Sequence, residues 1–416
     1  MSMHRATLWL SLAIVMGASA FAATPEPGSA PPAPVTAPAS APTPAPAPAP
    51  LRPVAFGAAV QAAGEALFSS ARAQLGDEAR EFVIDPLIDA STGQQTVGSV
   101  QMGEQLARIV SANHAMWRVQ PLSRVSLAKS PLLLMGTLTA IHTQPSSAEP
   151  ADAFRVWLTL VDLRTGRIVA KQLAAATAET VNAEPTRYFQ DSPTWHKDKT
   201  VAAYINSCQA KSKVGDPIDP AYLIRLPAAA LVQEAIASYT ERKLPEAHRL
   251  YQDAARLADS DDLRVLNGLY LTSWRLNKKK EAADAFGQIV AAGLRARQLP
   301  LKLLFSPGTT ALLPVPDLQA QYRLWLQQVA AQAGAGSACL KVVGHASRTG
   351  SAAVNDVLSA RRALVIERTL AGKSGPNADR ISSAGVGSRE NLVGLGTDDL
   401  RDALDRRVEF RVVDCQ

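Results

Sequence analysis

Hydrophobic residues after about residue 54 are spaced first for a helix and then for strands. Val60, Leu67, Ala71 and Leu75 recur at intervals that place them on one face of a helix. Apolar runs that predict strands, and a second helical run at 102–111, follow along the chain, the strand runs being 82–88, 117–119 and 132–141. Helices and strands are therefore expected to alternate in this part of the chain.

The next two strands are predicted to form an antiparallel hairpin. Apolar and polar residues alternate along 154–160, and a second strand pattern covers 167–173. Between them, Arg164-Thr165-Gly166 supplies a turn that ends in glycine. Residues 54–210 are thus expected to form an α/β domain whose last strands are antiparallel.

Residues 204–295 carry a helical pattern that repeats. Two groups of three residues recur at a spacing of 35, namely Ala247, Tyr251 and Ala254, then Ala282, Phe286 and Ile289. This resembles tetratricopeptide (TPR) hairpins, whose period is about 34 residues, although an independent array needs about three of them. Residues 211–297 are interpreted as a short TPR-like helical region, either a structural spacer or a groove for a partner.

Strand and helix patterns alternate again in residues 298–416. Strand patterns begin at 301, 339, 381 and 405, and helical patterns cover 318–331 and 353–370. Their order along the chain is βαβαββ. The predicted fold class is therefore α+β and multidomain, with an N-terminal α/β domain, a short helical region and a C-terminal βαβαββ domain.

The first 53 residues carry the pattern of an exported protein. Residues 1–23 combine a basic start, an apolar run at 8–16 and the small-x-small pattern Ala20-Phe21-Ala22, which predicts a cleaved signal peptide. Retention as an inner-membrane anchor is the alternative, because 18 successive residues of this segment are uncharged. Of the 28 prolines, 12 lie in residues 24–53, so this segment is expected to be a disordered Pro/Ala-rich linker.

The overall composition argues against several classes of protein. The net charge is +6, from 43 basic and 37 acidic residues, and only 5% of residues are aromatic, so no nucleic-acid partner is predicted. The sequence has no H-E-x-x-H, C-x-x-C or G-x-S-x-G motif, and its six histidines are dispersed. We therefore predict no enzyme activity, no cofactor, no metal site, and no membrane span once the signal is cleaved.

Three segments of residues 54–210 follow one another in an order known from a group of periplasmic domains. They are FVIDPLIDASTGQQT, SPLLLMGTLTAI and FRVWLTLVDLRTGRIVAK, with Gly136 at a strand end and a D-x-x-T-G turn at 162–166. The order resembles the domain shared by the penicillin-binding-protein activator LpoB, the flagellar protein FlgO and the curli secretion protein CsgG. The resemblance implies contacts with other envelope proteins and brings no catalytic residue.

Four motif blocks follow one another in the C-terminal region. They are G-H-A-S-R-T-G at 344–350, N-D-V-L-S-A-R-R-A at 355–363, G-V-G at 385–387 and D-R-R-V-E-F at 405–410. They resemble the signature of the OmpA-like peptidoglycan-associated domain: G-H-T-D-x-x-G, N-x-x-L-S-x-x-R-A, G-x-G and N/D-R-R-V-E-F. The resemblance implies that residues 298–416 are an OmpA-like domain of a periplasmic protein, with association with the outer membrane left open.

The same resemblance implies a binding site. Members of the family hold the diaminopimelate of the peptidoglycan stem peptide between an aspartate and an arginine, because this ligand carries an ammonium and carboxylates. Arg362 matches the arginine, but Ser347 stands where the family has aspartate. Asn355 is a candidate for shaping the site and Arg407 for reaching the ligand, whereas His345 is interpreted as a packed or hydrogen-bonded histidine and not as a general base.

The cysteines are Cys208, Cys339 and Cys415. In an exported protein a pair of cysteines can oxidise. If the last strand of the OmpA-like fold runs antiparallel beside the strand that starts at Cys339, Cys415 comes close to Cys339. A disulfide between Cys339 and Cys415 is therefore expected, with Cys208 left over.

These observations predict a non-enzymatic periplasmic protein. Its OmpA-like domain would bind the peptidoglycan stem peptide non-covalently, and its N-terminal domain would dock an envelope protein partner. The alternative is a scaffold or accessory protein of an envelope assembly, for secretion, motility or regulation of cell-wall synthases, without affinity for peptidoglycan. A cell-wall hydrolase or its direct activator is a third hypothesis.

Overall fold

The structure is a computed structural model. It describes residues 52–143, 151–259, 261–335, 338–374, 379–392, 394, 396–397 and 401–415. The chain divides into two units, Met1–Pro50 and Leu51–Gln416, and every described residue belongs to the second. The predicted signal peptide, residues 1–23, and all but two residues of the predicted linker, 24–53, lie outside the described residues. None of the described helices has the length and apolar character needed to span a membrane.

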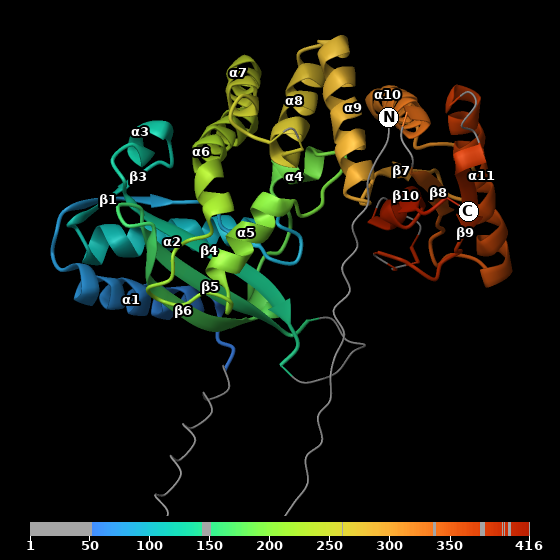
Figure 1. The fold of residues 1–416 in the computed structure, drawn as a ribbon. Helices are drawn as coiled ribbons and strands as arrows, with labels where there is room; N and C mark the ends of the chain where they lie inside the picture. Colours follow the sequence, from blue (N-terminus) through green and yellow to red (C-terminus); the bar gives the residue numbers. More distant parts are fainter. Residues whose placement is uncertain are drawn as a thin grey trace, which may run out of the picture. The chain divides into compact units, whose positions relative to one another are not determined.

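A mixed sheet forms the centre of the N-terminal part (Figure 1). Its strands are β1 (Arg80–Ile84), β2 (Ile88–Asp89), β3 (Trp117–Gln120), β4 (Leu132–Ile141), β5 (Ala153–Asp162) and β6 (Arg167–Thr177). They lie in the order β3-β1-β4-β5-β6, and β2 pairs with β4 outside this path. The pairings among β1, β2, β3 and β4 are parallel, whereas β4, β5 and β6 pair antiparallel. The predicted hairpin of β5 and β6 is confirmed.

The predicted strand at 82–88 was too long. β1 ends at Ile84 and the chain leaves the ladder before β2 begins at Ile88. Pro86 lies in this interruption and has no N–H to donate to a neighbouring strand. Asp85 lies at the start of this break: its backbone N–H still donates to the backbone oxygen of Leu134 at 2.9 Å, and its side chain contacts a helix, as described below.

Helices cover both faces of this sheet. On one face, α1 (Phe56–Leu75) and α2 (Val97–Asn113) pack against Leu132 and Leu134 of β4. On the other face, α5 (Lys199–Cys208) and α6 (Pro220–Thr240) pack against Leu133 and Met135. Successive side chains of a strand point to opposite faces of its sheet, so alternate residues of β4 belong to two separate hydrophobic clusters. Short helices α3 (Arg124–Leu127) and α4 (Arg187–Asp191) lie in the connections.

Consecutive helices form the middle of the described chain. After α6 come α7 (Leu244–Ala255), α8 (Leu263–Arg275) and α9 (Lys279–Arg295), and each packs on the next. Small residues lie at their crossings: Ala247 and Ala282 are fully buried, and a Cβ at Gly268 would lie 2.2 Å from the Tyr251 ring. Small residues at these positions let the helices approach closely. The likeness to TPR hairpins remains a prediction.

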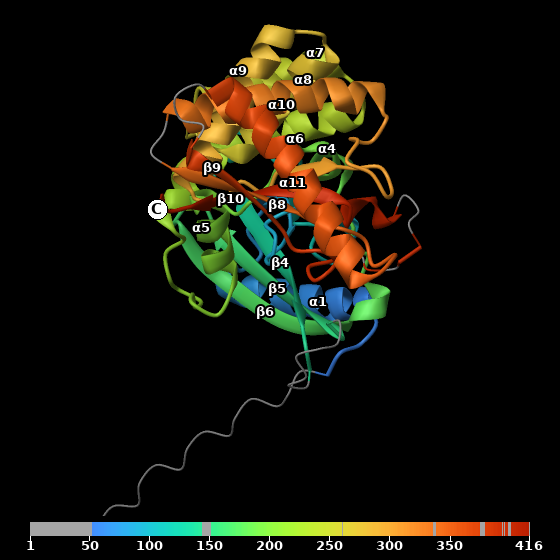
Figure 2. The same ribbon diagram turned by 90° about the vertical axis from the view of Figure 1, so that its right-hand side faces the viewer.

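A second sheet forms the C-terminal part. Its elements are β7 (Lys302–Leu304), α10 (Pro316–Ala335), β8 (Cys339–Gly344), α11 (Ala352–Ser374), β9 (Ile381–Gly385) and β10 (Arg407–Val413). The strand order is β7-β10-β8-β9, with β10 antiparallel to both neighbours and β8 parallel to β9. Figure 2 shows α11 beside these strands. The predicted βαβαββ order and α+β class are confirmed.

The register of β10 brings the two outer cysteines together. Val413 pairs with Cys339, so Cys415 follows directly beyond the pair. A disulfide joins Cys339 to Cys415, the pair expected from the sequence, and Cys208 is a buried free thiol.

One hydrophobic cluster contains residues of the middle helices and of the second sheet. Phe286 of α9 stacks on Trp325 of α10 with ring centroids 5.4 Å apart, and Trp325 donates a hydrogen bond of 2.7 Å to the Tyr270 hydroxyl. The predicted domain limits at residues 210 and 297 remain predictions.

Candidate functional site

The candidate site lies where β8 ends and α11 begins. β8 ends at Gly344, where a Cβ would lie 2.0 Å from the backbone oxygen of Ser359 on α11. At Gly385, the end of β9, a Cβ would lie 2.3 Å from the backbone nitrogen of Ala360. Only glycine at these two positions lets α11 approach the sheet this closely. The motif glycines therefore set the distance between α11 and the loop that follows β8.

Arg362 lies on the buried side of α11 and is completely buried. Its Nε donates to the backbone oxygen of Thr309 at 2.9 Å, and its Nη2 donates to that of Ser306 at 2.9 Å. Its Nη1 donates to the backbone oxygen of His345 at 3.1 Å, and the guanidinium lies 5.4 Å from the centroid of the Phe305 ring. All three side-chain nitrogens thus hold backbone segments on either side of the helix.

Ser347 and Asn355 lie in the same neighbourhood. Both are buried, and the Asn355 side chain donates a hydrogen bond of 3.1 Å from Nδ2 to the backbone oxygen of Ser347. This contact ties the loop after β8 to the first turn of α11. Ser347, Asn355 and Arg362 are therefore brought together around residues 345–347, and their assignment as ligand-binding residues remains a prediction.

Arg407 belongs to a different group of side chains. Its Nε donates to Oε2 of Glu409 at 3.0 Å, and its Nη atoms donate to the backbone oxygens of Glu390 and Leu404 at 3.3 Å. These contacts lie on the far side of His345 from Arg362, because His345 accepts from Arg362 through its backbone and faces Glu409 with its ring. A role for Arg407 at a ligand remains a prediction.

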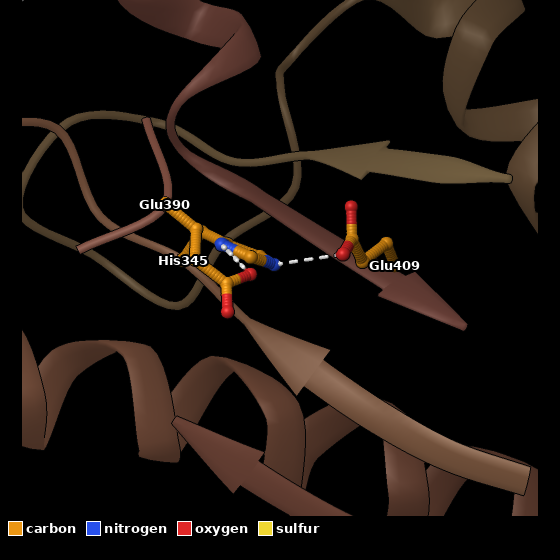
Figure 3. A group of neighbouring side chains, drawn as sticks. All are labelled: His345, Glu390 and Glu409. Carbon is orange, nitrogen blue, oxygen red and sulfur yellow. Dashed lines mark ion pairs between the residues drawn. The ribbon is translucent and has the colours of Figure 1, made fainter. Parts of the chain in front are cut away.

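His345, Glu390 and Glu409 form a cluster that the sequence did not reveal (Figure 3). The His345 side chain is only 1% exposed, with Nε2 lying 3.3 Å from Oε1 of Glu409 and Nδ1 lying 4.0 Å from Oε2 of Glu390. Neither ring nitrogen forms a hydrogen bond with a described residue. The three residues are far apart in sequence, and the pairing of Gly344 with Val408 brings His345 and Glu409 together.

Two arginines neutralise these carboxylates. Arg411 donates from Nη2 to Oε1 of Glu409 at 3.2 Å and also to Oε2 of Glu390. Burial pushes the pKa of Glu409 upwards, but contacts with His345 and Arg407 outweigh burial and hold this pKa below its ordinary value. Glu409 is therefore ionised across the physiological range. Of the residues described in this domain, His345, Glu390 and Glu409 offer the donor atoms that could hold a metal ion.

Comparison with known protein families supports the first three of the four motif blocks. The OmpA family matches residues 304–403. No curated protein matches the chain in sequence.

Similar solved structures each cover about 30% of the chain. The peptidoglycan-associated lipoprotein from Burkholderia pseudomallei is 20% identical over 27% of this chain and 89% of its own, with a TM-score of 0.24. The periplasmic domain of Helicobacter pylori MotB is 20% identical over 28% of this chain and 76% of its own, with a TM-score of 0.23. The cell wall anchor of the T6SS from Pseudomonas aeruginosa is 18% identical over 31% and 97%, with a TM-score of 0.24. Residues 304–403 are, by the family match, a C-terminal OmpA family domain.

Proposed function

We propose that this is a non-enzymatic periplasmic protein whose OmpA family domain binds peptidoglycan non-covalently. The observation that carries the proposal is the family match at 304–403, which includes Arg362 at the position of the motif arginine. The lipoprotein among the similar structures is named for its association with peptidoglycan, and the T6SS protein is named as a cell wall anchor. The ligand we propose is the diaminopimelate of the stem peptide.

The proposed contacts follow from the chemistry of the side chains. Arg362 would meet a ligand carboxylate, and Ser347 would accept a hydrogen bond from the ligand ammonium. A hydrogen bond between neutral groups contributes about 0.5 to 1.5 kcal/mol, against about 1.5 to 3 kcal/mol when one partner is charged. Since about 1.4 kcal/mol is a factor of ten in affinity, serine in place of aspartate should weaken binding roughly tenfold. Asn355 would hold the loop that carries Ser347.

The remaining described chain would present a partner surface. We propose that the α/β part, residues 54–210, contacts another envelope protein, as its resemblance to the LpoB, FlgO and CsgG domain implies. The helices of residues 211–297 would connect this part to the OmpA family domain. A pull-down from envelope extracts, with the full exported chain as bait, would identify the partner.

A second function merits a test because of two observations at the site. Ser347 removes the negative half of the family's ligand clamp, and Arg362 already donates from all three nitrogens to backbone carbonyls. Both features suit a scaffold of an envelope assembly without wall affinity. In that case the loop and helix around Arg362 would have a structural role.

Sedimentation with purified sacculi distinguishes these two functions. The full exported chain is compared with Ser347→Asp, which restores the family's carboxylate, and with Ser347→Asn, which has similar size but no charge. Wall binding predicts that the wild type co-sediments, that Ser347→Asp binds about tenfold more tightly, and that Ser347→Asn does not. Retention of neither the wild type nor Ser347→Asp would favour the scaffold.

Arg362→Ala locates the site once binding is seen. Circular dichroism and thermal melting must first show that the variant is folded, because the arginine holds three backbone oxygens on two segments of the chain. Loss of sedimentation in a folded variant supports the proposed site. Equal retention of the folded variant and the wild type would place the contact elsewhere on the molecule.

A further inference from the structure

We propose that His345, Glu390 and Glu409 form a binding site for a divalent transition metal ion, with zinc as the best match. The three residues offer one imidazole nitrogen and two carboxylate oxygens, and these atoms all lie within 4.8 Å of one another. Imidazole and carboxylate are ligands that zinc takes in proteins, with a water completing four-fold coordination when the protein supplies three ligands. The proposal is independent of peptidoglycan binding.

The state of His345 is the strongest indication of a ligand. Its side chain is 1% exposed, and neither ring nitrogen forms a hydrogen bond with a described residue, the contacts of Nε2 and Nδ1 being glutamate oxygens at 3.3 and 4.0 Å. Buried polar groups are nearly always satisfied, because leaving one unpaired costs free energy. Figure 3 shows each ring nitrogen facing one carboxylate, Nδ1 facing Glu390 and Nε2 facing Glu409, so a cation beside Glu409 would satisfy Nε2 directly.

The distances are compatible with a tetrahedral ion. Zinc bonds of about 2.0 to 2.2 Å at tetrahedral angles separate neighbouring ligand atoms by about 3.3 to 3.6 Å. Nε2 of His345 and Oε1 of Glu409 already lie 3.3 Å apart. Oε2 of Glu390 lies 4.0 Å from Nδ1, so Glu390 must turn towards Nε2 to share the ion, and its side chain is 43% exposed, which leaves it room to move.

Neighbouring residues hold the Glu409 side chain and the backbones of His345 and Glu390. Arg407 binds Oε2 of Glu409 and leaves Oε1 towards His345, and it also holds the backbone oxygen of Glu390. The backbone of His345 is held from both sides, by its N–H donating to the backbone oxygen of Arg407 at 2.8 Å and by Arg362 donating to its oxygen. Partners of this kind around the ligands raise metal affinity by restricting their motion.

Arg411 is the group that a metal ion would displace. It binds one oxygen of each glutamate, and these include the Oε1 that faces His345. The Arg411 side chain is 43% exposed, and ion pairs at such exposure contribute little, so it can turn into solvent when a cation arrives. Metal binding and the Arg411 contacts are therefore expected to compete.

Because a metal ion and Arg411 would compete for the same carboxylate oxygens, substitutions at Glu390 and at Arg411 should change zinc affinity in opposite directions. The full exported chain, without a histidine tag and after dialysis against EDTA, is titrated with zinc chloride by calorimetry, and its melting temperature is measured with and without zinc. We expect one zinc ion per chain and a rise in melting temperature. Glu390→Gln should weaken binding more than roughly tenfold, since even the loss of a residue supporting a ligand has an effect of that size. Arg411→Gln should tighten binding.

A second ion pair provides matched controls. Arg164 and Glu78 form an exposed pair in the α/β part, with side chains 46% and 56% exposed. Glu78→Gln and Arg164→Gln change the net charge in the same way as the two test variants, so both should leave zinc affinity unchanged. Absence of one-to-one binding, or equal zinc affinity of Glu390→Gln and Glu78→Gln, would overturn the proposal. The proposal would also be overturned if Arg411→Gln increased zinc affinity no more than Arg164→Gln does, because displacement of Arg411 would then play no part.

Discussion

Tyr222 of α6 donates a hydrogen bond to Oδ2 of Asp85, which lies in the interruption between β1 and β2. Both residues are buried. Burial raises the pKa of Asp85 to about 6, although the Tyr222 hydrogen bond and the charge of Arg264 oppose this effect. A carboxyl group that titrates near neutral pH thus lies between the first sheet and α6.

The stability of the protein should fall as this carboxyl ionises. Because its pKa is higher in the folded protein than the ordinary 3.8, the folded state binds the proton more tightly. The resulting stabilisation is complete below about pH 3.8 and is lost as the pH rises through about 6, and it amounts to at most about 3 kcal/mol. Burial, with the charge of Asp262, also raises the pKa of Asp198 to about 6, so the two groups act in the same direction.

Asp85→Asn should remove this group's share of the pH dependence. The amide stays neutral and its oxygen can still accept from Tyr222, so the variant should unfold at higher urea concentration than the wild type at about pH 7.5 and lose that advantage near pH 4. Urea unfolding at several pH values measures the difference. Asp284→Asn, at an exposed ion pair with Lys280, serves as control and should parallel the wild type. The prediction would be contradicted if the stability of Asp85→Asn changed with pH as steeply as that of the wild type.

The disulfide between Cys339 and Cys415 should contribute to the stability of the second sheet. The two cysteines are 76 residues apart in sequence, and closing such a loop stabilises by roughly 4 kcal/mol in the chain-entropy model. The Cys339→Ser/Cys415→Ser variant should lose free energy of unfolding of about that size. In denaturant without reductant, alkylation should add one label, at Cys208, and with reductant it should add three; three labels without reductant would show that the bond does not form.

Gly344→Ala and Gly372→Ala should have opposite effects although both are in the OmpA family domain. A Cβ at Gly344 would lie 2.0 Å from the backbone oxygen of Ser359, so α11 must shift and the melting temperature should fall by several degrees. At Gly372, which is part of α11, a Cβ would meet no described neighbour within 4 Å, and alanine there favours the helix by about 0.5 to 1 kcal/mol. Thermal melting of both variants is decisive: a neutral Gly344→Ala would mean that the helix approaches less closely.

Local sequence patterns predicted those elements whose residues contact others close to them in the sequence. β4 covers the predicted residues 132–141, and the hairpin of β5 and β6 turns at Gly166, whose φ of 67° suits glycine. β1 was overextended because an apolar run hides the effect of Pro86 on pairing. α2 begins at Val97, before the predicted 102, because Thr96 and Ser99 cap each other's backbone.

Local sequence patterns could predict only part of the candidate site. Motif blocks identified Arg362, Ser347 and Asn355, which the fold gathers around one loop. Glu409 lies in the D-R-R-V-E-F block and Glu390 in none of the four blocks, and the closeness of Glu409 to His345 could not be predicted because it depends on the long-range register between β8 and β10. The sequence prediction of no metal site rested on dispersed histidines, and it could not take account of carboxylates that the fold brings to one of them.

The position of β10 has a consequence for the order of folding. This strand comes last in the described sequence, yet it lies in the middle of its sheet and joins β7, about 100 residues earlier, to β8. Contacts this distant in sequence slow folding, since a long loop must close before they form. Until residues 407–413 emerge, β7 lacks the strand with which it pairs, and Glu409 is not beside His345. Assembly of the OmpA family domain should therefore be a late and cooperative event, sensitive to truncation of its final strand.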